Sequence, residues 1–312
     1  MKNPYQTRTG QAWLRPSWIV YLDILGFVED IRHAAESGAQ EEHLKLLRSA
    51  LTEAKECLIA AIKNLRHGMP DLPAPYVIKV FTDNIVLGFP IHDDGESEFG
   101  NMVSIVGRYQ YTLLKHGFFV RGGIAFGDLY MDDDVVYGKG LLDAYDAEHT
   151  RARDPRIVLG PSAMAQVHTH LAWYSSVDWA PHNEHLLVDS DSQMFVNYLA
   201  IPIDGWQAGD QLPAEYQNSA GKHRDLIVSR LKKFAQAPPL WSKYAWVGTY
   251  HNLFFTECVS RPELLIPAEM LSQPARRLAE VYTKSGRHIY RDGEVVGTFK
   301  SMSEYETQRE PE

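Results

Sequence analysis

The sequence predicts an α+β fold in which helices pack on one face of a sheet. Short apolar runs typical of strands alternate with longer runs of helical period, in the order βα–ββ–αβ–αβ, between residues 18 and 159. Two of the strand-like runs are each interrupted by one acidic residue, Asp23 and Asp83. A carboxylate in a buried strand has to lose its charge or find a cation. The pattern therefore predicts both a sheet and a charged site within it.

The first half of this pattern begins with a buried strand at residues 18–27. A helical region follows at about 29–66, where leucine and isoleucine recur at three- and four-residue spacing. Residues 68–75 form a loop rich in Gly and Pro. Residues 77–89 predict a hairpin with a tight turn at 82–84, because Asp and Asn tolerate the backbone angles of such turns.

The second half begins with an acidic loop at residues 92–100 and a helix at 101–115. The strand at 118–129 contains three glycines, which allow another backbone to approach closely. A helix at 138–151 and a short strand at 156–159 complete the pattern. These segments supply the remaining strands and helices of the predicted sheet.

The C-terminal part has a different character. Residues 173–199 are rich in aromatic side chains and predict strands at the sheet edge, and residues 214–234 and 240–258 predict two helices. The polar tail begins at about Ser285. We expect two domains, a catalytic domain at 1–200 and a helical extension with its tail at 201–312.

Composition narrows the range of functions. The chain has 312 residues and a formal net charge of −9, which argues against general binding to nucleic acid or to anionic membranes. The two cysteines, Cys57 and Cys258, form no metal or redox motif, and we expect both to be buried apolar residues in a reducing cytoplasm. No apolar run is long enough to predict a transmembrane helix.

Three further sets of residues are expected to have structural rather than functional roles. The acidic run at residues 132–134 predicts a solvated turn, since it lacks the spacing of a calcium loop. His168 and His170 have no companion ligand at metal spacing and predict surface or cap positions. The aromatic residues of the last helix predict packing in the core; they are Tyr244, Trp246, Tyr250 and Phe254.

The two interrupting carboxylates indicate a metal site. Asp23 and Asp83 would lie on adjacent strands, and paired Asp oxygens are typical ligands of Mg²⁺ on a nucleoside triphosphate. Taken singly, Asp23 also suits a helix cap and Asp83 an ordinary turn residue. The amides of Leu25, Gly26 and Phe27 begin a helix, where the dipole favours the phosphates of the same ligand.

The order and content of these segments resemble class III nucleotide cyclases over residues 15–170. Four motifs carry the resemblance: Tyr21–Phe27, Lys79–Asp83, Arg121–Gly127 and Tyr137–Gly140. The family fold is a ferredoxin-like βαββαβ core. The resemblance implies a homodimer with shared active sites, two Mg²⁺ or Mn²⁺ ions per site, and Asp23, Asp83 and the Ile24 carbonyl as metal ligands.

Departures from the family pattern bear on the substrate. Lys79 stands where the family reads the base, but Val135, Leu142 and Asp146 replace the adenine-reading Asp, the ribose-orienting Asn and the transition-state Arg. The helix Gly138–Glu148 is similar to that of cyclases from bacterial Pycsar antiphage systems. That likeness implies cyclic UMP or cyclic CMP made from UTP or CTP, and a separate effector that senses the messenger. From the net charge and the lack of a long apolar run, we expect no nucleic-acid partner and no membrane insertion.

Several roles stay open at this point. Arg121 is expected as a catalytic residue, with an ion pair as its alternative. Lys79, Lys139 and Tyr145 are expected to bind the nucleotide. The lysine at 79 alternatively reaches solvent, and Tyr145 with Glu148 alternatively packs a dimer interface. A purine cyclase and a catalytically degenerate nucleotide sensor remain the competing functions, the second because the family Asn and Arg are missing.

Overall fold

The computed structural model describes residues 2–65, 74–174, 176–177, 180–206, 211–272, 287–291 and 294–299. It divides into two compact units, 1–267 and 268–312. Most of the predicted loop at 68–75, and much of the tail beyond Ser285, lie outside the described residues. The second unit contains helix α9 (Ala268–Leu271) and a hairpin of β9 (Arg287–Arg291) and β10 (Glu294–Phe299).

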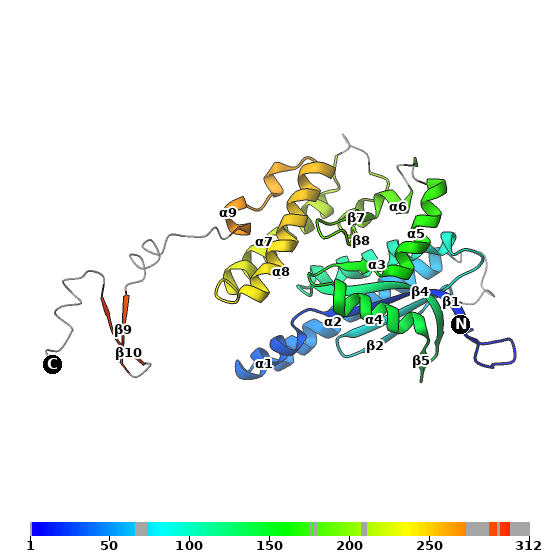
Figure 1. Ribbon diagram of the computed structural model, residues 1–312, viewed down its shortest axis with the longest axis horizontal. Helices are drawn as coiled ribbons and strands as arrows, with labels where there is room; N and C mark the ends of the chain where they lie inside the picture. The colour runs from blue at the N-terminus through cyan, green and yellow to red at the C-terminus, as the bar shows by residue number, and fades with distance from the viewer. Residues whose placement is uncertain are drawn as a thin grey trace. The chain divides into compact units, whose positions relative to one another are not determined.

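The first unit is built on a four-stranded antiparallel core (Figure 1). Its strands are β1 (Arg15–Ile24), β2 (Val77–Phe81), β3 (Asn84–Pro90) and β4 (Val120–Met131), in the order β2-β3-β1-β4. Strand β1 lies at the centre and pairs antiparallel with both β3 and β4. This arrangement confirms the predicted α+β fold with a ferredoxin-like core.

Four more strands extend the sheet to eight. Strand β6 (Ile157–Leu159) runs parallel to β4, and β8 (Met194–Val196) and β7 (Leu186–Val188) follow antiparallel at the edge. The short β5 (Val136–Tyr137) pairs with the end of β4. The predicted edge strands between 173 and 199 are thus confirmed in β7 and β8. Trp173 lies in a helix instead.

One face of the sheet packs against helices α2 (Gln40–Leu65), α3 (Glu96–Lys115) and α5 (Pro161–Tyr174). The single helical region predicted at 29–66 is divided, because Gly38 has φ 71° between α1 (Phe27–Glu36) and α2. Helix α3 begins inside the predicted acidic loop, at Glu96. Gly95 (φ 78°) caps it, and Glu96 and Glu98 favour the positive end of the helix dipole.

Helix α4 (Lys139–Arg151) packs on the opposite face, so the prediction that helices cover only one face was incomplete. A glycine explains its close approach. A Cβ built on Gly123 of β4 would lie 2.1 Å from the carbonyl oxygen of Ala144 and 2.8 Å from the Cβ of Ala147. Only glycine therefore leaves room for the backbone of α4 against this strand.

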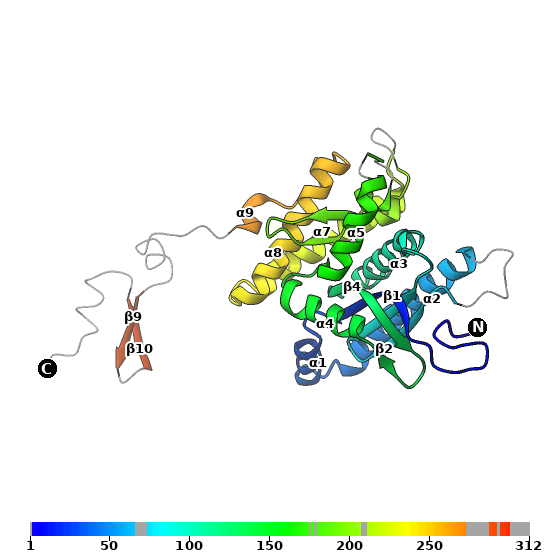
Figure 2. The same cartoon turned by 45° about the vertical axis from the view of Figure 1, so that its right-hand side comes forward.

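Helices α7 (Ala214–Lys233) and α8 (Pro238–Leu253) lie side by side in both views (Figures 1 and 2) and confirm the two predicted C-terminal helices. A π-helical turn, Phe254–Cys258, continues α8. The predicted aromatic packing is confirmed for Tyr244, Tyr250 and Phe254, each at most 4% exposed. The short helices α6 (Pro181–Glu184), η1 (Ile201–Ile203) and η3 (Pro262–Leu264) complete the unit. No helix of the described residues combines the length and apolarity needed to span a bilayer.

The structure corrects what the sequence predicted for His170 and for the two cysteines. His170 is not on the surface: it is 1% exposed, and its Nδ1 lies 3.1 Å from Nε2 of the buried His182. A second pair of buried histidines in contact, His223 and His251, was not predicted from the sequence. The expectation that both cysteines are buried was also wrong. Cys258 is exposed on the π-helical turn, and Cys57 is half-buried on α2, with its Sγ 3.6 Å from Oγ1 of Thr112 on α3.

The second histidine pair has a defined proton arrangement. His251 Nε2 lies 2.9 Å from the carbonyl oxygen of Leu264, which can only accept, so Nε2 carries the proton. His251 Nδ1 then accepts from His223 Nδ1 at 3.1 Å, and His223 Nε2 accepts from the Tyr198 hydroxyl at 3.3 Å. Every donor in this buried chain therefore meets an acceptor only while both rings are neutral.

Candidate active site

Three charged side chains meet where β1 and β4 lie side by side. The Nε of Arg121 donates to Oδ2 of Asp23 over 2.9 Å and lies 2.8 Å from Oε1 of Glu148. The side chains of Asp23 and Arg121 are 20% and 26% exposed, whereas Glu148 is 3% exposed. The Nε atom has one hydrogen and directs it at Asp23, so Glu148 Oε1 is a buried carboxylate oxygen without a hydrogen-bond donor among the described residues.

Strand register explains this meeting. Asp23 is opposite Arg121 on β4 and opposite Asn84 on β3, and directly opposite residues direct their side chains to the same face. That face is the one covered by α4. Because Gly123 admits the backbone of α4, the helix brings Glu148 down onto Arg121.

Asp83 lies beside this cluster in the β2–β3 turn. Its backbone carbonyl accepts from the amide of Ile24 over 3.2 Å, which joins the turn to the end of β1. Its Oδ1 accepts from Thr82 Oγ1 over 2.6 Å and from Asn84 Nδ2 over 3.1 Å. Thr82 has φ 56°, an angle that suits the glycine found there in the related motif. The turn is thus held with the two predicted carboxylates on neighbouring segments.

Electrostatics mark the cluster as rich in negative charge. Burial raises the pKa of Asp23, while Arg121 lowers it and Asp83 raises it. Burial also raises the pKa of Glu148, which Arg121 lowers and Asp23 raises. Two carboxylates, Asp23 and Glu148, thus share one guanidinium with a third carboxylate, Asp83, nearby, an arrangement that a divalent cation would stabilise.

Helix α8 adds a positive charge, Lys243, to the surroundings of Asp23. Burial lowers the pKa of Lys243 on α8, and the nearby Arg121 lowers it further, whereas Asp154, Asp23 and Glu29 raise it. The next residue, Tyr244, packs edge-on against Phe119 with ring centroids 5.3 Å apart, which seats α8 at the start of β4. Lys243 therefore belongs to the electrostatic surroundings of Asp23.

The chemistry of the donors fits the expected metal. The candidate donors near the end of β1 are the carboxylate oxygens of Asp23 and Asp83. With Glu148 they do not form a group of three donors within 4.8 Å of one another among the described residues, and the buried Glu148 oxygen faces Arg121. An all-oxygen donor set with excess negative charge is the kind that Mg²⁺ and Mn²⁺ prefer. Ile24 lies between the two Asp residues through its bond to Asp83, so its carbonyl is a candidate further ligand.

The predicted phosphate-binding segment is partly engaged within the chain. The amide of Leu25 donates to the carbonyl oxygen of Phe119 over 2.8 Å, so it is held by the fold. Gly26 takes φ 76°, a left-handed angle that favours glycine, and caps the ten-residue helix α1. The amides of Gly26 and Phe27 remain the candidates for an anion at the helix start.

Of the other three predicted nucleotide-binding residues, the two lysines are paired elsewhere in the chain, and Tyr145 packs on Tyr21 beside the cluster. Lys79 donates through Nζ to the backbone carbonyls of Asp132 and Asp133, which ties β2 to the solvated turn after β4. Lys139 is 79% exposed and pairs with Asp143 one turn along α4. Tyr145 packs edge-on against Tyr21, with ring centroids 5.4 Å apart, and is 43% exposed.

Sequence reasoning gave Lys243 no role at the site and left Glu148 open. For Glu148 the alternatives were lining the site or packing a dimer interface, and the structure buries it within its own chain against Arg121. Its spacing from Tyr145 on the helix was the only available signal. Lys243 comes from a helix outside the predicted catalytic domain, and an α8 lysine has no local pattern that points to β1.

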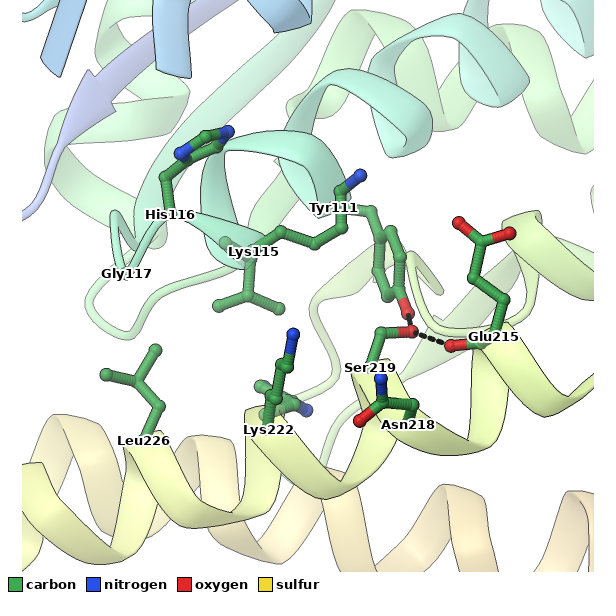
Figure 3. Close-up of a pocket in the computed structure, with 11 residues that line it drawn as sticks. Tyr111, Lys115, His116, Gly117, Glu215, Asn218, Ser219, Lys222 and Leu226 are labelled. Atoms are coloured by element: carbon green, nitrogen blue, oxygen red, sulfur yellow. Dashed lines mark hydrogen bonds between the residues drawn. The ribbon is translucent and has the colours of Figure 1, made fainter. Parts of the chain in front are cut away.

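A separate cavity of about 540 Å³ lies between the end of α3 and α7 (Figure 3). Tyr111 and Ser219 join their hydroxyls across it over 2.5 Å, and Lys115 and Lys222 approach it from the two helices. Lys115 and His116 already pair with Glu53. None of the carboxylates at the end of β1 lines this cavity, so its volume alone does not mark the site.

Comparisons with known proteins give distant likenesses. No protein-family model matches the chain, and no curated protein matches it. Among solved structures, the guanylyl cyclase Cya2 is 16% identical with a TM-score of 0.36, covering 49% of this chain and 78% of its own. A class III adenylyl cyclase-like ATP-binding protein from Pseudomonas aeruginosa is 9% identical with a TM-score of 0.37, covering 52% of this chain and 37% of its own. At these values neither likeness decides what this chain binds.

Proposed function

We propose that the chain is a nucleotide cyclase that converts UTP or CTP to the 3′,5′-cyclic monophosphate and pyrophosphate, as a signal in antiphage defence. The observation that carries this proposal is the placing of Asp23 and Asp83 on neighbouring segments joined by the Ile24 amide. The pyrimidine preference rests on the sequence, because Val135 replaces the Asp with which the family reads adenine.

In the reaction, the ribose 3′-oxygen forms a bond to the α-phosphorus, the bond to the bridging oxygen breaks, and pyrophosphate leaves. Two bound Mg²⁺ or Mn²⁺ ions would lower the pKa of the 3′-hydroxyl and neutralise the triphosphate. Asp23 and Asp83 would hold them. The amides of Gly26 and Phe27 would meet the terminal phosphates at the start of α1.

Arg121 suits the role of stabilising the transition state. Both of its ion pairs use Nε, which leaves the two terminal nitrogens of the guanidinium for phosphate oxygens. Glu148 acts as a positioning residue, because its buried carboxylate holds Arg121 when Asp23 turns to a metal. Lys79 would read the base only after releasing the carbonyls of Asp132 and Asp133.

A homodimer with shared sites is part of the proposal. Exposed large apolar side chains lie on β2, on β5 with the turn before it, and on α4. They are Val80, Phe81, Val135, Tyr137, Leu142 and Tyr145, each at least 43% exposed. Such a surface favours an interface with a second copy. Sedimentation of the purified chain tests it: a monomer at the concentrations of the activity assay would contradict shared sites.

The experiment for the activity is product identification by mass spectrometry with UTP, CTP, ATP and GTP in separate reactions containing Mn²⁺. We expect cyclic UMP or cyclic CMP from the wild type and none from Asp83→Asn. Asp134→Asn, an exposed carboxylate of the solvated turn, is the matched control and should retain turnover. Cyclic AMP or cyclic GMP as the product would overturn the base assignment.

The competing function is a nucleotide sensor. It is favoured by α4, where Leu142 is 62% exposed and Asp146 stands in place of the family Arg. Calorimetric titration with UTP and Mg²⁺ separates the two functions. Binding without any cyclic product from the four triphosphates would support the sensor, and a full rate in Asp83→Asn would refute metal-assisted cyclisation at this site.

A further inference from the structure

A group of side chains with the donor types of a metal site lies near the β7 edge of the sheet. Glu184, His185 and Asp204 each place one donor atom within 4.8 Å of the others. His185 directly follows α6, and Asp204 directly follows η1, so two short helical turns bring the donors together. None of the three belongs to the cluster around Asp23.

The burial and the unpaired ring nitrogens of His185 are typical of a metal ligand. His185 is 3% exposed, and neither of its ring nitrogens has a hydrogen-bond partner among the described residues. Its Nε2 lies 3.5 Å from Oδ1 of Asp204. Two donors bound at about 2.1 Å to one tetrahedral ion stand roughly 3.4 Å apart, so this separation suits a shared metal better than a hydrogen bond.

The charge state also suits a ligand. Burial lowers the pKa of His185, against the opposing effects of Asp204 and Glu184, while Arg108 on α3 lowers it further. A lowered pKa favours the neutral imidazole, which is the form that binds metals. The two carboxylates outnumber the one guanidinium nearby, which leaves net negative charge for a cation.

The backbone at this position is fixed. The amide of Asn197 donates to the carbonyl of His185 over 2.9 Å, and its side-chain Nδ2 donates to the carbonyl of Glu184 over 3.3 Å. Asn197 is itself 3% exposed and accepts from the hydroxyl of Tyr250 over 2.8 Å. The backbone that carries two of the three donors, Glu184 and His185, is thus held by a buried network from the residue after β8 and from α8.

We propose that Glu184, His185 and Asp204 bind one divalent transition-metal ion, of which Zn²⁺ is the representative. One imidazole and two carboxylates form a mixed nitrogen and oxygen set that Zn²⁺ and Co²⁺ prefer over Mg²⁺. The ion joins the end of α6 to the end of η1, across the segment that carries β7 and β8. This site does not depend on the cyclase activity.

The test is calorimetric titration of the full chain with Zn²⁺ after removal of metals, in excess Mg²⁺ to occupy the all-oxygen site. We expect one Zn²⁺ per chain, and a raised Tm on addition of Zn²⁺. Both effects should be lost in His185→Gln and in Asp204→Asn, and retained in Asp83→Asn. His168→Gln, an exposed histidine of α5, is the matched control.

A second variant separates loss of Zn²⁺ binding from loss of folding. If His185→Gln does not fold, Asp204→Asn remains, because its side chain is 45% exposed and the change conserves shape. Visible absorption of the Co²⁺ form should report a four- or five-coordinate site that disappears in Asp204→Asn. Unchanged Zn²⁺ stoichiometry in Asp204→Asn, or loss of Zn²⁺ in Asp83→Asn alone, would overturn the proposal.

Discussion

Replacing Gly123 by alanine tests how α4 reaches the sheet. The added Cβ would lie 2.1 Å from the Ala144 carbonyl oxygen and 2.6 Å from the Glu148 amide nitrogen, whereas ordinary contacts begin at 3.4 Å. The helix would have to withdraw by about 1.3 Å along the closer contact, because both obstacles are backbone atoms that no rotamer change can move. We expect destabilisation of about 3 kcal/mol, the upper part of the range for overpacking.

Thermal unfolding followed by circular dichroism measures the effect. For a unit of this size, 3 kcal/mol corresponds to a Tm lower by roughly 6 to 12 °C. Gly221→Ala is the matched control, because its Cβ would meet nothing within 4 Å on helix α7. That variant should gain roughly 0.5 to 1 kcal/mol from helix propensity. Equal stabilities for the two variants would refute the close-packing argument.

Two further predictions concern buried ionisable groups. Burial lowers the pKa of His251 to about 4 and the pKa of His223 well below its usual value, so both contribute stability that is present above pH 6.5 and lost as pH falls toward 4. We expect the free energy of unfolding in urea to fall between pH 7.5 and pH 5 by about 2 kcal/mol for His251 alone, and a flat profile would contradict this. Arg156 is fully buried between Asp189 and Asp191, so Arg156→Met should destabilise by roughly 3 to 5 kcal/mol. Arg153→Met, with a side chain 82% exposed, should change stability by less than about 0.5 kcal/mol in the same urea titration, and equal losses would contradict the role of burial.

The strands were predictable because their signals are local. The hairpin at Asp83 followed from two apolar runs and a turn, and the neighbouring strands of Asp23 and Asp83 followed from the two acidic interruptions. The register, which sets Asp23 opposite Asn84, was not predicted. Whether these carboxylates bind metal stays a prediction. The start of α3 at Glu96 was hidden, because Gly95 and the acidic residues after it suit a loop as well as a helix start.

Three features of the structure could not be predicted from the sequence, because they depend on contacts between segments far apart in the chain. Burial of Glu148 follows from the approach of α4 to Gly123, and no property of the helix itself reveals which strand it will contact. The same holds for Lys243, whose surroundings come from β1 and β4. His185 has an unremarkable sequence context, and only the folding of two short helical turns sets it beside Asp204.

Because β1 lies at the centre of the sheet, it stays without its partner strands during part of the synthesis of the chain. Asp23 and Arg121 are 98 residues apart in the chain, and the partners of β1 on both sides are synthesised after it. At about 5 to 20 residues per second, the ribosome needs roughly 5 to 20 s to complete that stretch. Strand β3 (Asn84–Pro90) becomes available partway through this interval. Until then the apolar segment from Trp18 to Ile24 has no neighbouring strand, so the nascent chain depends on α1 and α2, or on a chaperone, to cover it.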